Sequence, residues 1–486
     1  MRALLGADRR ITRREMLVTT GAASGALALS GGVWQLARAA APLASAAAPQ
    51  FVSRPDLHIP GISIAGAGAD VASGPILLAP YDAPNNAQAG AAVIDAATGA
   101  VIWEQPLSGL VTTDFRVQSY RGAPALTWWE GVIRLGHGVG SYVIADASYA
   151  PIARVDAGNG LHGDLHEFLL TERGTALLTS YVVTDADLRA VGGSSNGSIQ
   201  DAIFQEIDIA SGRVLLEWHS LEHIPITESY WPLGENWDYV HINSIAVDAD
   251  DNLLVSSRNT HTIYKLDRSS GQIIWRLGGR SSDFALDRDA VFAWQHDARR
   301  QPDGSITVFD NGNSVSRALV LSVDDSARRV SLARAYTHPH ALFADSQGNV
   351  EMLPNGNVFV GWGAQPYVSE FSPDGALLLD GRLGRDYISY RAYRAPWAGS
   401  GVGEPAVATR RGHGGSTVYV SWNGDTRVAR WTALAGTSAA NLVPIASAAR
   451  RGFETSIGLP AAATVVRLRG TDASGRTLVT TAAASV

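Results

Sequence analysis

The sequence predicts an all-β protein: a six-bladed β-propeller over residues 50–398, followed by a small C-terminal β-sandwich-like domain over residues 399–486. Three observations predict this fold. A hairpin of two apolar strands returns six times, a second hairpin precedes it in several copies, and no long stretch has the periodicity of an amphipathic helix. Four strands per repeat without helices are typical of propeller blades, and they argue against a helical bundle or a Rossmann fold.

The first hairpin is recognised by an Asp that opens its turn and a Gly four positions later. The clearest copies run Val93–Trp103, Glu206–Leu216 and Lys265–Trp275. Asp side chains bond the backbone of their own turn, and Gly readily takes the left-handed conformation that ends it. Six copies are anchored on Asp95, Asp146, Asp208, Asp267, Asp324 and Asp374, at spacings of 51, 62, 59, 57 and 50 residues. This repeat predicts six blades.

The second hairpin opens with a polar residue ahead of its first strand. In four successive blades that residue is His166, His241, His296 or Gln347. The first strand of each propeller blade lines the central channel, so equivalent positions converge near the axis. We therefore expect the three imidazoles to meet at one mouth of the channel. The antiparallel partner strand returns Arg258 to the level of His241, which adds a guanidinium to this group.

The end of the chain has a different pattern. Gly399–Gly403 is a glycine-rich linker, and alternating apolar runs follow it at Thr417–Trp422, Val428–Leu434 and Thr464–Arg469. Short alternating strands separated by turns are typical of a β-sandwich. We therefore expect residues 399–486 to form a separate small β domain.

The first 46 residues are expected to be an export signal. An Arg-rich start, with Arg13-Arg14 in Thr12–Leu17, precedes an apolar stretch of small residues. This pattern predicts twin-arginine export of the folded protein, and the alternatives are an ordinary secretory signal or an uncleaved anchor. We expect N-terminal sequencing of periplasmic or extracellular protein to find its first residue between about Ala40 and Phe51. No later stretch reaches the roughly 18 continuous apolar residues of a membrane span.

The amino-acid composition limits which residue types can carry a reaction and which partners the protein can bind. The chain has 486 residues and no Cys, which excludes thiolate nucleophiles and disulfides, and Lys265 is its only lysine. Residues 1–46 hold six of the 39 basic and two of the 46 acidic residues, so the rest carries 33 and 44, a net charge of −11. This balance argues against nucleic acid as a partner. Arg, His, Asp, Glu, Ser, Thr and Tyr must carry any reaction.

Three imidazoles beside an Arg suit an anionic ligand. Three histidines can ligate zinc or copper, but a nearby guanidinium repels a cation. A guanidinium binds planar oxyanions with two hydrogen bonds, and imidazole acts near neutral pH as nucleophile, acid or base. The pattern therefore predicts a site for a sulfate or phosphate ester, with no metal and no cofactor.

Several motifs resemble the arylsulfotransferase family over about residues 70–430. They are Trp237–Ile245, Ser256–Tyr264, Trp275–Gly279, Gln295–Arg299, Phe309–Gly312 and Ser346–Val350. The chain is most similar to the broad branch of bacterial and fungal members. The resemblance implies a six-bladed propeller that moves a sulfuryl group from a phenolic sulfate ester to a phenol, without a nucleotide sulfate donor. The chain lacks the disulfide typical of bacterial members with established activity.

The resemblance also implies roles for individual residues. His296 matches the histidine that takes the sulfuryl group as a covalent intermediate, which implies ping-pong kinetics. His241 and Arg258 match residues that hold the sulfate oxygens. His166 matches a further histidine, although His162 lies four residues earlier and aligns as an alternative. Two more residues are expected to bind substrate, Asn243 and Arg299, although Arg299 has the alternative of an ion pair with Asp297 or Asp310.

Other exported propellers remain as alternatives. A quinoprotein-like dehydrogenase needs a coloured cofactor, and a lactonase-type hydrolase needs calcium or zinc. A non-catalytic propeller would use the same histidines to bind a ligand. Visible absorbance, sensitivity to a chelator and assay with an aryl sulfate distinguish these classes.

Overall fold

The computed structural model describes residues 42–486, apart from residues 67, 83–86, 89, 106–107 and 385. The predicted export signal lies outside the described residues except for its last five positions. Within the described part of the chain, no helix is long and apolar enough to cross a membrane.

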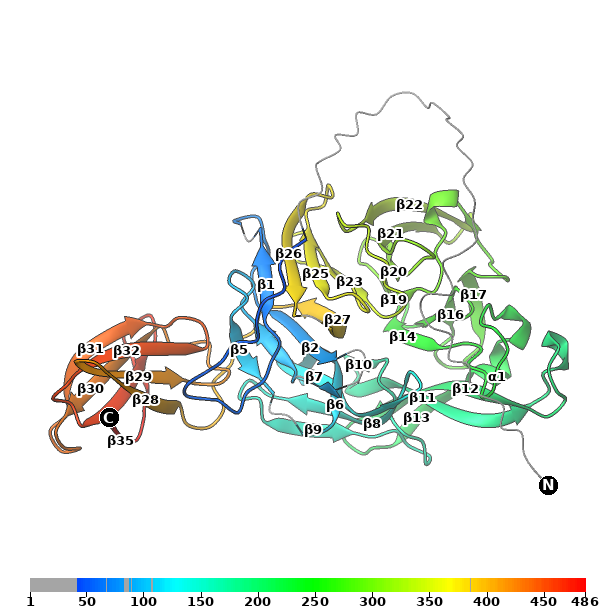
Figure 1. Ribbon diagram of the computed structural model, residues 1–486. Coiled ribbons are helices and arrows are strands. Elements are labelled where there is room, and N and C mark those ends of the chain that lie inside the picture. The colour runs from blue at the N-terminus through cyan, green and yellow to red at the C-terminus, as the bar shows by residue number, and fades with distance from the viewer. Residues whose placement is uncertain (1–41, 67, 83–86, 89, 106–107, 385) are drawn as a thin grey trace, which may run out of the picture. The chain divides into compact units, whose positions relative to one another are not determined.

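The described chain is almost entirely β, as the sequence predicts. Helix is confined to one four-residue α-helix and three single 3₁₀ turns: α1 (Ser220–His223), η1 (Arg189–Val191), η2 (Ile226–Glu228) and η3 (Arg288–Ala290). The other regular elements of the described residues are strands, joined by turns and longer loops (Figure 1).

Six sheets of mainly antiparallel strands succeed one another along residues 62–394, and we number them in the order of their first hairpins. Sheet 1 contains β27 (Tyr387–Arg394), β2 (Ile76–Asp82), β4 (Ala92–Ile94) and β5 (Val101–Glu104), with β3 (Ala87–Gln88) on β2. Sheet 2 contains β6 (Val111–Tyr120), β7 (Ala123–Arg134), β8 (His137–Ala145) and β9 (Pro151–Val155). Sheet 3 contains β10 (Phe168–Leu170), β11 (Thr175–Ala186), β12 (Gly197–Asp208) and β13 (Val214–His219).

The remaining three sheets repeat this order. Sheet 4 contains β14 (Ile242–Val247), β15 (Leu253–Ser257), β16 (Thr262–Leu266) and β17 (Ile273–Gly278). Sheet 5 contains β19 (His296–Arg300), β20 (Ile306–Asp310), β21 (Arg317–Asp324) and β22 (Arg329–Tyr336), with β18 (Ala285–Leu286) parallel to β22. Sheet 6 contains β23 (Asn349–Met352), β24 (Val358–Gly361), β25 (Tyr367–Phe371) and β26 (Leu377–Leu383), with β1 (Ile62–Ala65) on β26.

The Asp-anchored hairpins occupy one position in every sheet. All six turns join the third strand of a sheet to its fourth. In sheet 4 the Asp267 carboxylate accepts the Ser270 N–H at 2.8 Å, and Gly271 ends the turn with φ of 73°. Positive φ is strain-free for Gly. The repeat found in the sequence is therefore the outer hairpin of each sheet.

Apolar cores lie between neighbouring sheets. Side chains of a strand alternate between its two faces, so Ile76 and Leu78 of β2 pack with sheet 6 while Leu77 packs with sheet 2. Similar cores join sheets 2 and 3, 3 and 4, 4 and 5, and 5 and 6. Sheet 1 itself combines β27, from the end of the repeat, with β2 from its start. Each sheet therefore packs against its two neighbours in sequence, and sheet 6 packs against sheet 1.

Residues 406–485 form two further antiparallel sheets. One contains β28 (Ala406–Gly412), β29 (Gly415–Ser421) and β32 (Glu454–Pro460). The other contains β31 (Val443–Ala449), β30 (Arg430–Gly436), β33 (Val465–Thr471), β34 (Thr477–Thr480) and β35 (Ala484–Ser485). Val418 and Val420 of the first sheet share a core with Trp431 and Leu468 of the second. Asn423 Nδ2 donates to the carbonyl oxygen of Glu104 at 2.9 Å, which ties these sheets to sheet 1.

Candidate active site

The opening residues of three sheets meet in one cavity. His166 and His241 lie just before β10 and β14, and His296 begins β19. The cavity has a volume of about 210 Å³ and also contains Arg258. Its lining consists of Tyr81, Thr113, Ile133, Gly136, Leu165, His166, His241, Arg258, His296, Ser346, Gln347 and Tyr390. The ring centroids of His166 and His241 are 4.7 Å apart. Because these histidines hold equivalent positions in successive sheets, the fold brings together side chains that are far apart in the sequence.

Irregular backbone positions these residues. The pairing of β14 with β15 shifts between Ile242 and Ser244, and that of β19 with β20 shifts between His296 and Arg299. A bulge of this kind bends the strand and turns its side chains. His241 has φ of 58° and Gln347 φ of 66°, a left-handed conformation that is uncommon for non-glycine residues and clusters at functional sites.

His296 is held as a neutral imidazole with one nitrogen available for chemistry. Its Nδ1 lies 2.8 Å from Asn311 Oδ1 and 3.1 Å from the Trp294 carbonyl oxygen, so Nδ1 carries the hydrogen. Its Nε2 accepts the Gln347 N–H at 3.1 Å and therefore carries a lone pair. Burial, and then the charge of Arg258, lower the pKa of His296 well below its usual value. A neutral imidazole with an unprotonated Nε2 is a nucleophile once the Gln347 N–H turns to another acceptor.

The other two histidines are anchored by carboxylates instead. His166 Nδ1 lies 2.5 Å from Asp164 Oδ2, and His241 Nδ1 lies 2.5 Å from Asp238 Oδ2. Carboxylate oxygens accept, so each Nδ1 donates and Nε2 is the nitrogen left for a ligand. Burial lowers the pKa of His241 to about 4. Carboxylate anchors stabilise an imidazolium that forms transiently, as a proton carrier requires. The amide anchor of His296 lacks that property.

Arg258 supplies positive charge without a neutralising carboxylate. It follows β15, and its guanidinium carbon lies 5.1 Å from the ring centroid of Trp231 and 5.0 Å from that of Trp294. Nη1 donates to Asn259 Oδ1 at 2.8 Å, and Nη2 donates to the Asp345 carbonyl oxygen at 3.1 Å. No carboxylate of the described chain forms an ion pair with it. Two indole rings therefore fix a cation that is free to bind an anion.

Asn243 and Arg299, both expected at the substrate, lie outside the cavity lining. Asn243 Nδ2 donates to the Gln295 carbonyl oxygen at 2.7 Å. Arg299 Nη2 lies 2.5 Å from Glu167 Oε2 and 2.7 Å from Asp297 Oδ1. The structure thus contains the alternative in which Arg299 pairs with Asp297. Both side chains brace neighbouring strands around the site.

Arg299 belongs to a largely buried group of three cations and three anions. Its members come from sheets 1, 2, 3 and 5 and are Asp114, Arg116, Glu167, Asp297, Arg299 and Arg391. Arg391 lies 2.9 Å from Asp114, and Arg116 lies 2.5 Å from Glu167. Burying charge is costly unless it is paired, so removal of one member leaves an uncompensated charge. These ion pairs link the strands around the site. Arg258, in contrast, forms no ion pair with a carboxylate of the described chain.

The structure also separates the two candidates for the third histidine. His166 is buried and lines the cavity, whereas His162 is exposed and contributes nothing to its lining. Asp164 explains the difference, because its carboxylate bonds both the ring and the backbone N–H of His166.

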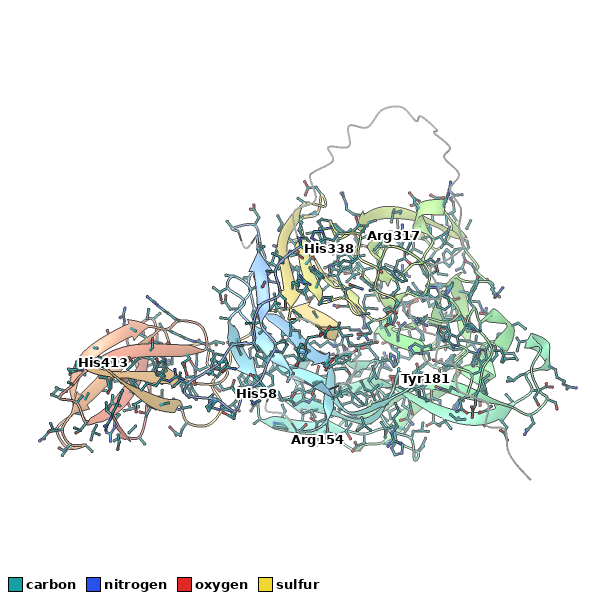
Figure 2. All side chains as sticks on the ribbon, in the orientation of Figure 1. His58, Arg154, Tyr181, Arg317, His338 and His413 are labelled. Carbon is teal, nitrogen blue, oxygen red and sulfur yellow. The ribbon has the colours of Figure 1, made fainter. Side chains whose placement is uncertain are left out.

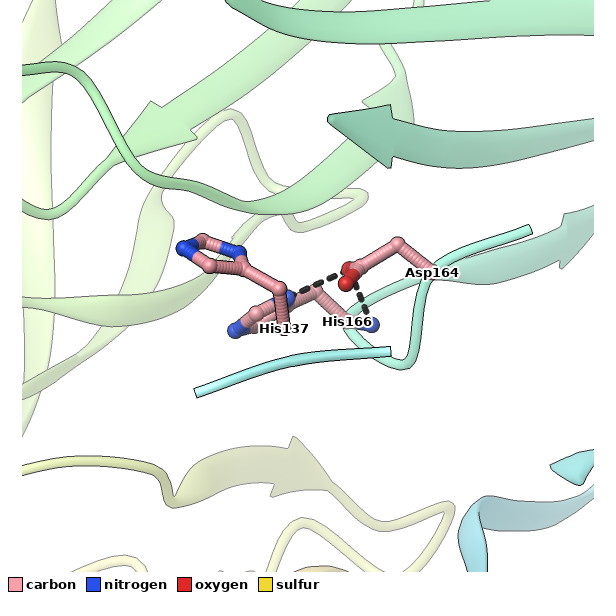
Figure 3. A group of neighbouring side chains, drawn as sticks. All are labelled: His137, Asp164 and His166. Atoms are coloured by element: carbon pink, nitrogen blue, oxygen red, sulfur yellow. Dashed lines mark hydrogen bonds and ion pairs between the residues drawn. The ribbon is translucent and has the colours of Figure 1, made fainter. Parts of the chain in front are cut away.

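Sequence reasoning missed His137, which begins β8. Its Nε2 lies 3.2 Å from Asp238 Oδ2, the oxygen that also anchors His241. Burial opposes its charged form, but the bond to Asp238 raises the pKa of His137 above its usual value. Figure 3 shows His137 beside His166, with the bonds from His166 to Asp164. His137 lies 4.1 Å, between ring centroids, from Tyr181 of β11, which is labelled in Figure 2. His137 lies on an outer hairpin, so the repeat of opening residues did not reveal it.

Two sets of these residues have ligand atoms close enough for a metal ion. They are His137 with Asp164 and His166, and His137 with Asp238 and His241, each set within 4.8 Å. Both carboxylates already accept Nδ1 hydrogens, and Arg258 shares the cavity. A bound cation would have to displace those bonds beside a guanidinium, so the donor sets fit an anion site better than a metal site.

Buried histidines should make the stability of the fold sensitive to acid. Burial lowers the pKa of His241 and His261 to about 4, whereas the unfolded chain has values near 6.5. Between those pH values the unfolded chain binds more protons, so this contribution to stability is lost as pH falls. Burial raises the pKa of Glu104 to about 7 and that of Glu351 to about 8, which acts in the opposite direction.

The substitution His241→Gln isolates the contribution of this histidine to the pH dependence of stability. In His241→Gln the unfolding free energy should be less dependent on pH than in the wild type between pH 6.5 and 4. The difference should approach about 1.4 kcal/mol per pH unit, the effect of one proton. Urea denaturation at several pH values measures it. Parallel pH profiles for the two proteins would show that His241 does not resist protonation.

Comparisons with known proteins agree with the motifs. The arylsulfotransferase (ASST) family model matches residues 116–384, more than half of the chain. No curated protein matches the sequence. Similar solved structures include a protein of unknown function from Bacteroides caccae, with a TM-score of 0.42, 13% identity and coverage of 66% of this chain and 98% of that one. Virginiamycin B lyase from Staphylococcus aureus has a TM-score of 0.33 and 9% identity, covering 75% of this chain and 96% of its own. The family match includes His166, His241, Arg258, His296 and Gln347 of the cavity, and the chain therefore belongs to the arylsulfotransferase family.

Proposed function

We propose that the protein moves a sulfuryl group from a phenolic sulfate ester to a phenol through a covalent intermediate on His296, without a nucleotide donor. The observation that carries the proposal is the pairing, in one cavity, of a neutral imidazole nucleophile with an unpaired guanidinium. We further propose that the six sheets are the blades of a closed propeller, followed by a β-sandwich. Packing of each sheet on its two neighbours supports the closed ring.

In the first step, His296 Nε2 attacks the sulfur of the donor. The N–S bond forms as the bond from sulfur to the phenolic oxygen breaks. The leaving phenolate takes the Nε2 proton of His166, which enters the step as an imidazolium held by Asp164 and leaves it as a neutral ring. Arg258 stabilises the charge on the sulfuryl oxygens. The Gln347 N–H, 3.1 Å from Nε2, is also placed to donate to one of those oxygens.

In the second step, the acceptor phenol replaces the released phenol. Its oxygen attacks sulfur and loses its proton to the histidine that acted as the acid, while the N–S bond breaks and restores neutral His296. Both displacements use the same groups in opposite roles, which makes the kinetics ping-pong.

Incubation with p-nitrophenyl sulfate tests the proposal. We expect release of p-nitrophenol to depend on an added phenol, and the sulfate ester of that phenol to accumulate in equal amount. A chelator should leave the rate unchanged, because no step uses a metal. Hydrolysis without transfer, or loss of activity with the chelator, would instead favour a metal-dependent hydrolase built on the His137 sets.

A further inference from the structure

A second cavity adjoins the site and is larger than it. We call it the outer chamber; it has a volume of about 530 Å³ and shares His241 and Arg258 with the first cavity. Its lining also includes Leu135, His137, Trp231 and Trp237. A ligand whose charged end reaches Arg258 can therefore extend into this chamber.

The mouth of the outer chamber presents apolar side chains to solvent. Leu135, at the turn between β7 and β8, is 93% exposed, and Trp231 is 42% exposed. Tyr230 and Leu233, beside Trp231 in the chain, are exposed as well. Single exposed apolar residues are ordinary, but a group of them around a cavity is typical of a ligand-binding surface.

Trp231 is held in place although it is exposed. Its ring centroid lies 5.1 Å from the guanidinium carbon of Arg258, and its ring meets that of Trp294 edge to face, with 5.9 Å between ring centroids. Its carbonyl oxygen accepts the indole N–H of Trp237 at 3.2 Å. An immobilised indole offers a stacking surface at little entropic cost. The same indole thus connects the charged site to the outer chamber.

We propose that the outer chamber binds the aryl part of the donor and then of the acceptor, and that its size favours phenols of two or more rings. This inference rests on the proposed function. The inner cavity, at about 210 Å³ and with three histidines, two tyrosines and Arg258 in its lining, holds the sulfuryl group and the reacting ring. The chamber volume lies within the roughly 300–1,000 Å³ typical of sites for drug-sized ligands.

Direct binding tests the chamber without any reaction. Isothermal titration calorimetry with 2-naphthol, in the absence of a sulfate donor, should show binding to the wild type. Leu135→Ser and Trp231→Ala should each weaken it by on the order of 10-fold, since each removes apolar contact from the ring. Leu215→Ser is the matched control, because Leu215 of β13 is 46% exposed and lies outside both cavities. Its affinity should equal that of the wild type.

Kinetics provide the second readout. The ratio of kcat/KM for 2-naphthol to that for phenol should exceed one in the wild type and fall about 10-fold in Leu135→Ser. If the wild type and Leu135→Ser both transfer sulfate with the same 2-naphthol-to-phenol ratio, or if 2-naphthol does not bind, the proposed role of the outer chamber is wrong. The proposed function would remain. Binding that both substitutions weaken, in a protein that transfers nothing, would support the chamber and overturn the proposed function.

Discussion

His296→Ala should abolish sulfuryl transfer, with a loss on the order of 10⁴–10⁶-fold in kcat, the scale seen when a covalent nucleophile is removed. The substitution removes the Nε2 lone pair, and no other cavity histidine combines a neutral ring with an amide anchor. Rapid quench of the wild type with excess aryl sulfate, followed by intact-mass measurement, should show one added sulfuryl group. The variant should show none.

Two controls separate chemistry from folding. His296 is buried, and its loss leaves Asn311 Oδ1 without that donor, at a cost of about 1–3 kcal/mol. His296→Gln retains a polar side chain, so it should unfold closer to the wild type and remain inactive. His162→Ala changes an exposed histidine nearby in the chain and should retain full activity. A His296→Ala protein that is folded and still forms the intermediate would assign the nucleophile to His166 or His241.

Arg258→Lys should lower kcat/KM by about 10²–10³-fold, the usual effect of removing a donor that stabilises transition-state charge. An ammonium retains the charge, but it lacks the planar fork that binds two sulfuryl oxygens and the flat surface that packs against Trp231 and Trp294. Initial rates with p-nitrophenyl sulfate, alongside thermal unfolding of both proteins, measure the effect.

Arg280→Lys is the matched control for this substitution. The Arg280 guanidinium also stacks on an aromatic ring, 4.1 Å from the centroid of Tyr230, but it lies outside the cavity lining. Its replacement should change kcat/KM by less than about threefold. Equal losses in the two variants would indicate that aromatic stacking near the site, and not charge stabilisation by Arg258, accounts for the result.

Repeated local chemistry made much of the fold predictable. The Asp267 turn needs only its own carboxylate, the Ser270 N–H and a glycine that tolerates positive φ. Because the same turn occupies the same place in each sheet, its spacing predicted the repeat. The alignment of His166, His241 and His296 followed from that repeat, and the structure places all three in one cavity.

Bulges explain why some site residues could not be placed in advance. A strand alternates its side chains between faces only while its pairing is regular. The pairing of β14 is interrupted at Asn243, and that of β19 between His296 and Arg299. Counting from the histidines along these strands therefore did not show that Asn243 and Arg299 bond to neighbouring strands outside the cavity lining.

Arg258 and Arg299 show most clearly what the sequence could not predict. Each is an Arg near a motif histidine, and local sequence offers no reason to treat their charges differently. In the folded chain Arg299 meets Glu167, which is 132 residues away in sequence, whereas Arg258 packs against Trp231 and Trp294. Turns and alternation are local and can be recognised in a sequence. Whether a charge is neutralised depends on which distant side chains pack beside it, because Coulomb energy depends on distance in space.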